Sequence, residues 1–265
     1  MEDRVVALVT GGSSGIGKAV CESLSKRGVR VYELSRRQAR NDAAFHISAD
    51  VTDEESIKAA VGTILEKEEK IDILVNCAGF GIGGAVEFTK TEDAIRQLDV
   101  NFFGMVRTTK AVLTHMRQRG RGRIVNISSV AAPVPIPFQT YYSASKAAIN
   151  SYTAALANEV RPYGISVCAV MPGDISSGFT KAREKSIQGD REYKGRIQRS
   201  IAKMEKDERE GMSPSVCGEY IVKIALKKKV KPYYSVGPVY KFLCVLMKLL
   251  PCRLSNRVLY ILYAR

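Results

Sequence analysis

The feature that most constrains the fold of this 265-residue chain is a regular alternation of short β-branched runs and longer amphipathic stretches. The short runs have the length of buried strands, and the longer stretches show helical spacing of their apolar residues. This alternation predicts βαβ units, in which helices cover both faces of a parallel sheet. The predicted strands are 5–9, 29–34, 71–75, 123–127, 165–170 and 233–236, and the predicted helices are 15–27, 53–68, 91–118, 141–161 and 214–228.

The length and the absence of a linker or internal repeat predict one α/β domain over residues 1–265, with a doubly wound parallel sheet. Two segments depart from the alternation. Residues 178–213 are polar and rich in Lys and Arg, whereas residues 238–265 are apolar with interspersed basic residues. Pro251 divides the second segment into parts too short for a membrane span of about 20 residues. We therefore expect two short helices there, as a C-terminal extension.

Charge and cysteine content restrict the class of partner and the compartment. The net charge of +14 suits nucleic acid, anionic lipid or a polyanionic small molecule. No zinc-finger spacing or RNA-binding signature is present, which argues against nucleic acid. The six cysteines form no CxxC pair, so we expect free thiols and no metal site. With no export signal at the N-terminus, a cytoplasmic location is expected.

A glycine-rich turn follows the first predicted strand and precedes the first predicted helix. Glycines there let the backbone approach a ligand closely, and the helix N-terminus offers unpaired N–H groups to a pyrophosphate. Thr10-Gly11-Gly12-Ser13-Ser14-Gly15-Ile16-Gly17 resembles the TGxxxGxG motif of the short-chain dehydrogenase/reductase family. The resemblance implies a Rossmann-type fold and a nicotinamide dinucleotide bound by Gly11, Ser13, Ser14, Gly15, Ile16 and Gly17.

The end of the second predicted strand bears on the choice between NAD and NADP. Members of the family that prefer NAD place an aspartate here, and this chain has Ser35 followed by Arg36 and Arg37. Hydroxyl and guanidinium groups can hold a 2′-phosphate through charge-assisted hydrogen bonds. The sequence therefore predicts NADP(H), although a solvated basic loop has the same composition.

Three more segments resemble cofactor-binding motifs of the family. Asp50 and Val51 resemble the pair that contacts adenine, although Asp50 is equally suited to cap the helix at 53–68. Asn76, Ala78 and Gly79 resemble the NNAG motif, with Cys77 in place of the second asparagine. The turn after strand 165–170 resembles the PGxVxT motif that holds the nicotinamide carboxamide, through Pro172, Gly173, Ile175 and Ser177.

The catalytic residues are predicted from spacing and resemblance together. Tyr142 and Lys146 are four residues apart, so they share one helix face, and a lysine charge favours the phenolate. Ser129, thirteen residues earlier, ends a strand and can polarise a carbonyl. The resemblance implies that Tyr142 is the proton donor, that Tyr142 and Lys146 also contact the cofactor, and that Asn101 holds a water linked to Lys146.

The substrate is predicted from the loop 130–138, which contains no charge. An apolar loop beside the reacting carbonyl suits a lipophilic ketone or alcohol. The sequence around Tyr142 also resembles that of hydroxysteroid dehydrogenases, which favours a steroid-like substrate. Reduction of a 3-oxoacyl thioester, on coenzyme A or acyl carrier protein, is the alternative, because the basic segment 178–213 falls where the family has its substrate lid.

The sequence also allows two functions other than catalysis: a sensor that binds NADPH without catalysis, and a protein whose C-terminal tail lies on a membrane surface. The resemblance also implies a homodimer or homotetramer joined through helices 91–118 and 141–161.

Overall fold

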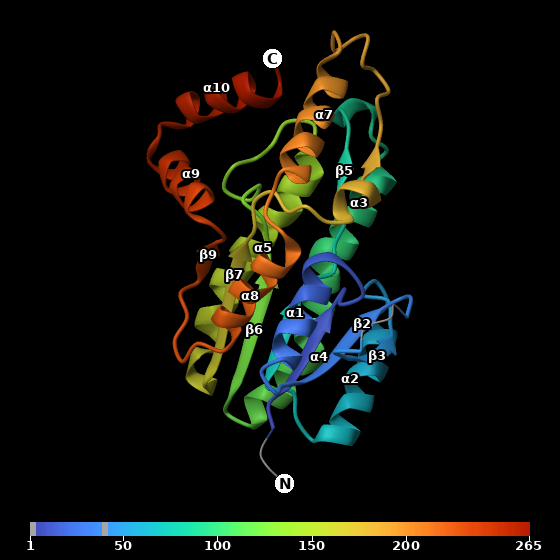
Figure 1. The fold of residues 1–265 in the computed structure, drawn as a ribbon, viewed down its shortest axis with the longest axis vertical. Coiled ribbons are helices and arrows are strands. Elements are labelled where there is room, and N and C mark those ends of the chain that lie inside the picture. Colours follow the sequence, from blue (N-terminus) through green and yellow to red (C-terminus); the bar gives the residue numbers. More distant parts are fainter. Residues whose placement is uncertain (1–3, 39–41) are drawn as a thin grey trace.

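The computed structural model describes residues 4–38 and 42–265. Seven parallel strands form one sheet in the order β3-β2-β1-β4-β6-β7-β9, with helices on both faces (Figure 1). The predicted α/β class, the doubly wound sheet and the single domain are therefore confirmed. The strands are β1 (Val6–Thr10), β2 (Arg30–Ser35), β3 (Phe45–Ser48), β4 (Ile73–Asn76), β6 (Gly122–Ile127), β7 (Ile165–Met171) and β9 (Tyr233–Ser235).

Two apolar cores, one on each face, hold the sheet between its helices. Successive residues of a strand point to opposite faces, so Ala7 and Val9 join one core while Val6 and Leu8 join the other. The first core is closed by α1 (Gly15–Ser25) and α8 (Pro214–Ala225). The second is closed by α2 (Glu54–Glu68), α4 (Gly104–Gln118) and α5 (Thr140–Glu159).

The strand order reverses between β1 and β4, which pair in register from Ala7–Ile73 to Thr10–Asn76. The chain proceeds outward from β1 through β2 to β3 on one side, and from β4 through β6 and β7 to β9 on the other. In a sheet of this kind, ligands bind beyond the carboxyl ends of the strands at the reversal. The predicted motifs all lie at that end.

Each predicted strand is found within two residues of its predicted bounds. The structure differs from the prediction at one further strand and at one helix. The strand β3 was not predicted, because its sequence Phe-His-Ile-Ser is half-polar and partly exposed. The single helix predicted over 91–118 is instead α3 (Thr91–Leu98), a π-helical turn η2 (Asp99–Phe103) and α4.

The two segments outside the alternation lie together beyond the carboxyl end of the sheet (Figure 1). The predicted C-terminal extension forms two helices, α9 (Pro238–Leu249) and α10 (Cys252–Tyr263). Across residues 4–38 and 42–265, no helix is both long and apolar enough to cross a membrane. The polar segment contains α6 (Phe179–Ala182), β8 (Glu184–Lys185), which pairs with β5 (Ile82–Gly83), and α7 (Arg196–Arg209); short 3₁₀ turns are η1 (Val86–Phe88) and η3 (Arg161–Tyr163).

Candidate active site

The glycine turn between β1 and α1 is built for close approach of a ligand. Gly11 and Gly15 have φ of +68° and +52°, which side chains other than glycine adopt rarely. A Cβ on Gly11 would lie 2.9 Å from the Cα of Ala78, so the turn is packed against the end of β4. Thr10 fixes that contact, because its Oγ1 accepts from the backbone N of Cys77 at 3.0 Å and of Ala78 at 3.2 Å.

The N-terminus of α1 follows directly on this turn. Ser14 is the N-cap residue, and its side chain makes no capping hydrogen bond within the part of the chain that the structure describes. The first N–H groups of α1 are thus available to an anion, as a dinucleotide pyrophosphate requires. Ser13 and Ile16 are half-buried beside them, and Gly17 packs against the carbonyl of Gly11. These residues fit a bound dinucleotide.

At the end of β2 the structure shows a carboxylate that the sequence reasoning overlooked. Glu33 is buried beneath Gly12 and pairs with His46 of β3. Two residues along the same strand face, Ser35 donates to Glu33 Oε1 at 3.3 Å and to the carbonyl of Arg37 at 2.9 Å. Arg36 and Arg37 are exposed. The i, i+2 spacing of Glu33 and Ser35 is the signal that could have revealed this contact.

The segment after β3 corrects one prediction and places another. The N-cap of α2 is Asp53, whose side chain accepts from Glu55 N and Ser56 N, and Asp50 does not cap that helix. Asp50 instead accepts from the backbone N and the hydroxyl of Thr52 at 2.9 Å and 2.8 Å. Val51 is buried against Gly104.

The end of β4 joins the cofactor turn to the interior. The side chain of Asn76 is buried and donates to Thr109 at 3.1 Å and to Asn126 at 2.9 Å, so it holds α4 and β6 rather than facing the cleft. Gly79 lies in the cleft, where a Cβ would approach Asn101 Oδ1 at 3.0 Å and Lys146 Nζ at 3.7 Å. The absence of a side chain at this position leaves room around both groups.

The catalytic residues predicted on β6 and α5 are brought together at the carboxyl end of the sheet. The hydroxyl of Ser129 lies near the half-buried phenol of Tyr142 and acts to lower its pKa. Lys146 lies beneath the tyrosine, with Nζ 5.6 Å from the ring centroid and donating to the carbonyl of Ile127 at 2.9 Å. Ser128 points elsewhere and donates to the carbonyl of Lys146 at 3.1 Å.

Burial dominates the proton affinity of this group. It raises the pKa of Tyr142 to about 12, against the opposing effects of the Ser129 hydrogen bond and the Arg183 charge. It lowers the pKa of Lys146 to about 8. The expectation that Lys146 brings the phenol toward neutral pH is therefore not met in this structure, because loss of solvation outweighs the neighbouring charges. The phenol is protonated at neutral pH, as a proton donor must be.

Asn101 lies in the π-helical turn η2, and this turn explains its position. Its Oδ1 accepts from Phe80 N at 2.9 Å, and its Nδ2 donates to Phe80 O at 3.0 Å and to Ser145 Oγ at 3.1 Å. The side chain thus ties the loop after β4 to α5. A π-turn inside a helix is often found at a functional site.

The turn after β7 lies opposite the glycine turn. Pro172 accepts from Val130 N at 2.9 Å, Ile175 pairs with Met212, and a Cβ on Gly15 would lie 3.8 Å from Ser177. Gly173 is covered by Tyr240 of α9, whose hydroxyl donates to Asp174 Oδ2 at 2.6 Å. The predicted nicotinamide turn therefore lies next to the predicted phosphate turn, and α9 covers its outer side.

The polar segment folds over Tyr142. Phe179 of α6 has its ring centroid 5.8 Å from that of Tyr142. The next turn is fixed by a buried ion pair between Arg183 and Glu208 of α7, and Thr180 donates to the same carboxylate at 2.6 Å. The amide oxygen of Gln139, correctly oriented, accepts from Arg183 Nε at 3.1 Å. None of these contacts could be found from the sequence, because they join residues distant along the chain.

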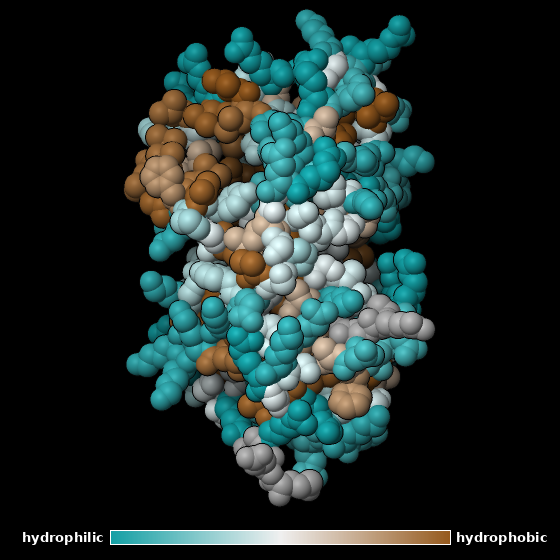
Figure 2. Space-filling model, viewed as in Figure 1, coloured by the Kyte–Doolittle hydropathy of each residue, from teal (hydrophilic) through white to brown (hydrophobic). Residues whose placement is uncertain are grey.

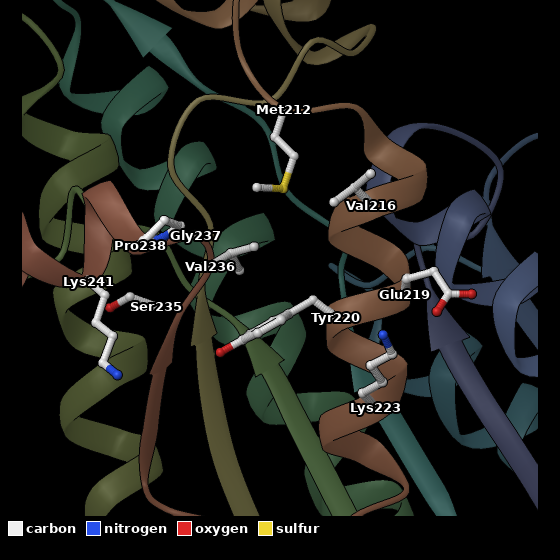
Figure 3. A pocket seen from close by; sticks show the side chains of 10 residues that line it. All are labelled: Met212, Val216, Glu219, Tyr220, Lys223, Ser235, Val236, Gly237, Pro238 and Lys241. Atoms are coloured by element: carbon white, nitrogen blue, oxygen red, sulfur yellow. The ribbon is translucent and has the colours of Figure 1, made fainter.

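A cavity of about 600 Å³ lies elsewhere, between α8 and the segment from β9 to α9 (Figure 3). Tyr220 and Lys223 of α8 point toward Val236 and Lys241 across it. None of the predicted catalytic or cofactor-binding residues lines this cavity. It is therefore separate from the candidate active site.

Comparison with known proteins identifies the family. Residues 5–188 match the family model described as short chain dehydrogenase. The chain belongs to the short-chain dehydrogenase/reductase family. This dehydrogenase is 41% identical over 268 residues to the 3-ketodihydrosphingosine reductase of Bacteroides thetaiotaomicron, covering 100% of this chain and 99% of the relative.

Solved structures agree with this assignment. A short-chain dehydrogenase from Streptomyces avermitilis superposes with a TM-score of 0.83 at 30% identity, covering 98% of this chain and 96% of that one. A serine dehydrogenase complexed with NADP⁺ superposes with a TM-score of 0.77 at 25% identity, covering 89% and 95%. The chain is thus an oxidoreductase of carbonyl and alcohol groups in a family that uses NAD(P).

Proposed function

We propose that this short-chain dehydrogenase is an NADPH-dependent reductase that converts a long-chain lipophilic ketone to a secondary alcohol. The observation that carries the proposal is the grouping of Ser129, Tyr142 and Lys146 at the carboxyl end of the sheet, beside a glycine turn that fits a dinucleotide. An intact set of this kind favours catalysis over a sensor that only binds the cofactor.

In the proposed reaction each side chain has one task. The hydroxyl of Ser129 donates to the carbonyl oxygen of the substrate and stabilises the negative charge that develops there. Tyr142 then gives its phenolic proton to that oxygen, and its high pKa keeps the proton available at neutral pH. In this proposal Lys146 stabilises the resulting phenolate and holds the nicotinamide ribose, and Asn101 holds a water that resupplies the proton. The nicotinamide, when bound, supplies the hydride.

We propose NADPH rather than NADH because of the groups at the end of β2. Arg36 and Arg37 are exposed there, and Ser35 turns its hydroxyl toward their loop. The carboxylate of Glu33 is buried and paired with His46, so it is unsuited to accept from a ribose hydroxyl of the cofactor. Guanidinium groups favour a 2′-phosphate.

The substrate class follows from the mouth of the cleft. The loop 130–138 contributes Val134, Ile136 and Phe138 to apolar clusters with α7 and the tail. A lipophilic chain can be buried against such a surface. The full-length similarity to a 3-ketodihydrosphingosine reductase makes a long-chain ketone of that kind the proposed substrate, in place of the steroid expected from the sequence.

A substrate panel tests this proposal. NADPH oxidation by the full chain is measured with 3-ketodihydrosphingosine, a ketosteroid and a 3-oxoacyl thioester as matched substrates. We expect kcat/KM for the first to exceed the others by at least tenfold. Preference for the thioester would overturn the substrate class, and no turnover with any ketone, with NADPH binding retained, would overturn the enzymatic function.

We also propose that the protein is a homodimer or homotetramer that acts in the cytoplasm. Helix α5 exposes a stripe of small residues, Ala144, Ala147 and Ser151, and Phe103 is exposed at the start of α4. Small residues let two helices approach closely. All six cysteines are free thiols, as a reducing compartment requires. Light scattering of the full chain tests the oligomer, with Ala147→Glu expected to dissociate it.

A further inference from the structure

Helices α9 and α10 expose an apolar surface that no described part of the chain covers. Figure 2 shows it as the broadest hydrophobic area on the face in view, at the place of α9 and α10 in Figure 1. Phe242 is 68% exposed and Leu249 is 77% exposed, values usual for charged residues. We call this surface the tail face; its members are Val239, Phe242, Val245, Leu246, Leu249, Leu254, Ile261 and Leu262.

The helical spacing shows that the tail face is a continuous stripe. In α9, Val239, Phe242 and Leu246 follow one another at three and four residues, and Leu249 continues the series. The opposite side of the helix, centred on Met247, is buried. Helix α10 repeats the pattern, with Leu254 and Ile261 exposed and Leu259 buried. Each helix therefore has apolar residues on its exposed side as well as on its buried side, and its basic residues lie between the two.

Charge identifies what the tail face fits. From Tyr220 to Arg265 the chain contains lysine and arginine but no acidic side chain. Lys241 and Lys248 lie seven residues apart on one flank of the stripe in α9, and Arg253 and Arg257 lie four apart on one flank in α10, all exposed. Apolar side chains bordered by long basic ones are the pattern of helices that lie in the interface of an anionic membrane.

We propose that the tail face binds the surface of an anionic lipid bilayer, with α9 and α10 lying flat in the headgroup region. Each helix has 12 residues, too few to cross the hydrocarbon core of about 30 Å but enough to lie along its boundary. A second copy of the chain is a poorer occupant, because pairing two tail faces brings together the basic flanks of two proteins of charge +14.

The buried side of the same helices borders the mouth of the active site. Met247 and Leu259 pack against Val134 of the loop 130–138. Tyr263 and Ala264, at the end of α10, join Phe138 and Ile201 in a neighbouring cluster. A bilayer on the tail face therefore lies one layer of helix away from the loop 130–138, and a lipid substrate would reach the proposed active site from this side of the molecule. This last step rests on the proposed function, whereas membrane binding itself does not.

Vesicle flotation of the full chain tests the proposal. The probes are vesicles of phosphatidylcholine alone and of an equimolar mixture with phosphatidylglycerol. We expect binding to the mixed vesicles that weakens with salt. F242S/L249S should lower the partition coefficient by roughly tenfold or more. K241E/K248E should lower it by roughly 30-fold or more on the mixed vesicles only.

The matched control is K228E/K229E, which makes the same change of charge in the exposed turn between α8 and β9, at the other end of the molecule (Figure 1). It should lower binding by less than about threefold. Equal flotation of wild type, F242S/L249S and K241E/K248E would overturn the proposal. A concentration-dependent dimer in sedimentation velocity that F242S/L249S abolishes, without vesicle binding, would assign the tail face to a second copy instead.

Activity without vesicles separates this proposal from the proposed function. Reduction of a short, water-soluble ketone by NADPH should be the same for wild type and all three double variants, because none of the replaced residues lies in the cleft. If the wild type reduces no ketone but still floats, the proposed reaction fails and the membrane surface stands. If all variants reduce the ketone equally and none binds vesicles, the membrane surface fails alone.

Discussion

Helices α5 and α9 both depart from the usual distribution of side chains, in opposite directions. Helix α5 buries polar groups, including Lys146 at 6% exposure, whereas α9 exposes apolar ones, including Leu249 at 77%. A buried ammonium costs free energy unless it is hydrogen-bonded, and exposed apolar area forgoes the stabilisation that burial gives. Neither arrangement improves stability, and each coincides with a site proposed above to bind a ligand.

The two departures are compensated differently. On α5 the polar groups have internal partners: Lys146 donates to Ile127 O, and Thr153 accepts from Asn126 at 2.9 Å. On α9 the exposed apolar side chains have no such cover among the described residues, and the bilayer proposed above would supply it. Both a buried polar residue and an exposed apolar residue therefore help to locate a functional site. The buried polar residue suggests a catalytic site, and the exposed apolar residue suggests a surface that binds another molecule.

The largest effect is expected at the polar end of this comparison. Tyr142→Phe removes the proton donor and should lower kcat for ketone reduction by about 10²–10⁴-fold. The aromatic ring stays in place, so NADPH binding, followed by fluorescence titration, should remain measurable. Wild-type turnover in this variant would remove Tyr142 from the proton-donor role.

The buried apolar face of α5 sets the scale for stability. Ile149 is 2% exposed, and Ile149→Ala should lower the free energy of unfolding by about 2–5 kcal/mol through lost contacts and a cavity. Denaturant unfolding measures this change. A loss below about 1 kcal/mol would show that α5 is packed more loosely than the structure indicates.

The buried ammonium of α5 predicts a pH dependence. The pKa of Lys146 is lowered to about 8 by burial, so its charge is present below that pH and lost above it. The rate of ketone reduction should therefore fall above about pH 8, approaching tenfold per pH unit. Tyr142, with a pKa of about 12, stays protonated through this range. A kcat profile measured from pH 6 to 10 tests the assignment, and Lys146→Met, although much slower, should lack the step.

A smaller effect is expected where the chain meets the cofactor phosphate. Arg36→Ala should raise KM for NADPH by about tenfold, the range of one charge-assisted hydrogen bond, and leave KM for NADH unchanged. Arg161→Ala, an exposed arginine of η3, is the control. Equal changes with both cofactors would show that Arg36 does not read the 2′-phosphate.

The smallest effect is expected at the apolar end of the comparison. Phe242→Ser should change the free energy of unfolding by less than about 0.5 kcal/mol, because the ring is exposed and few contacts are lost. Set beside Ile149→Ala, this variant measures how far α9 departs from an ordinary helix. A loss as large as that of Ile149→Ala would mean that the ring is buried in solution.

Local patterns were enough to predict most of the sheet and the cleft. Strand period, glycine spacing and the four-residue spacing of Tyr142 and Lys146 are properties of neighbouring residues, and their geometry follows directly from the backbone. The predicted positions at β1, β4, β6 and β7 accordingly converge at one end of the sheet.

Contacts between distant segments could not be predicted in this way. The pair Glu33–His46 depends on β3, whose sequence is too polar and too short to read as a strand. The ion pair of Arg183 with Glu208 joins residues that only the folding of the segment 178–213 brings together. The raised pKa of Tyr142 could not be predicted for the same reason. It results mainly from burial of the phenol, and Phe179, which contributes to that burial, is distant along the chain.

The position of Asn101 depends on the number of residues in the π-helical turn at Asp99–Phe103. A π-turn holds one residue more than an α-turn, so deleting Val100 would join α3 and α4 into one regular helix. That repair would improve the helix and rotate one half by about 100° relative to the other, withdrawing Asn101 from Phe80 and Ser145. A single substitution in this helix leaves its length and the position of Asn101 unchanged. A single deletion, in contrast, would make the helix more regular but break the hydrogen bonds of Asn101 to Phe80 and Ser145.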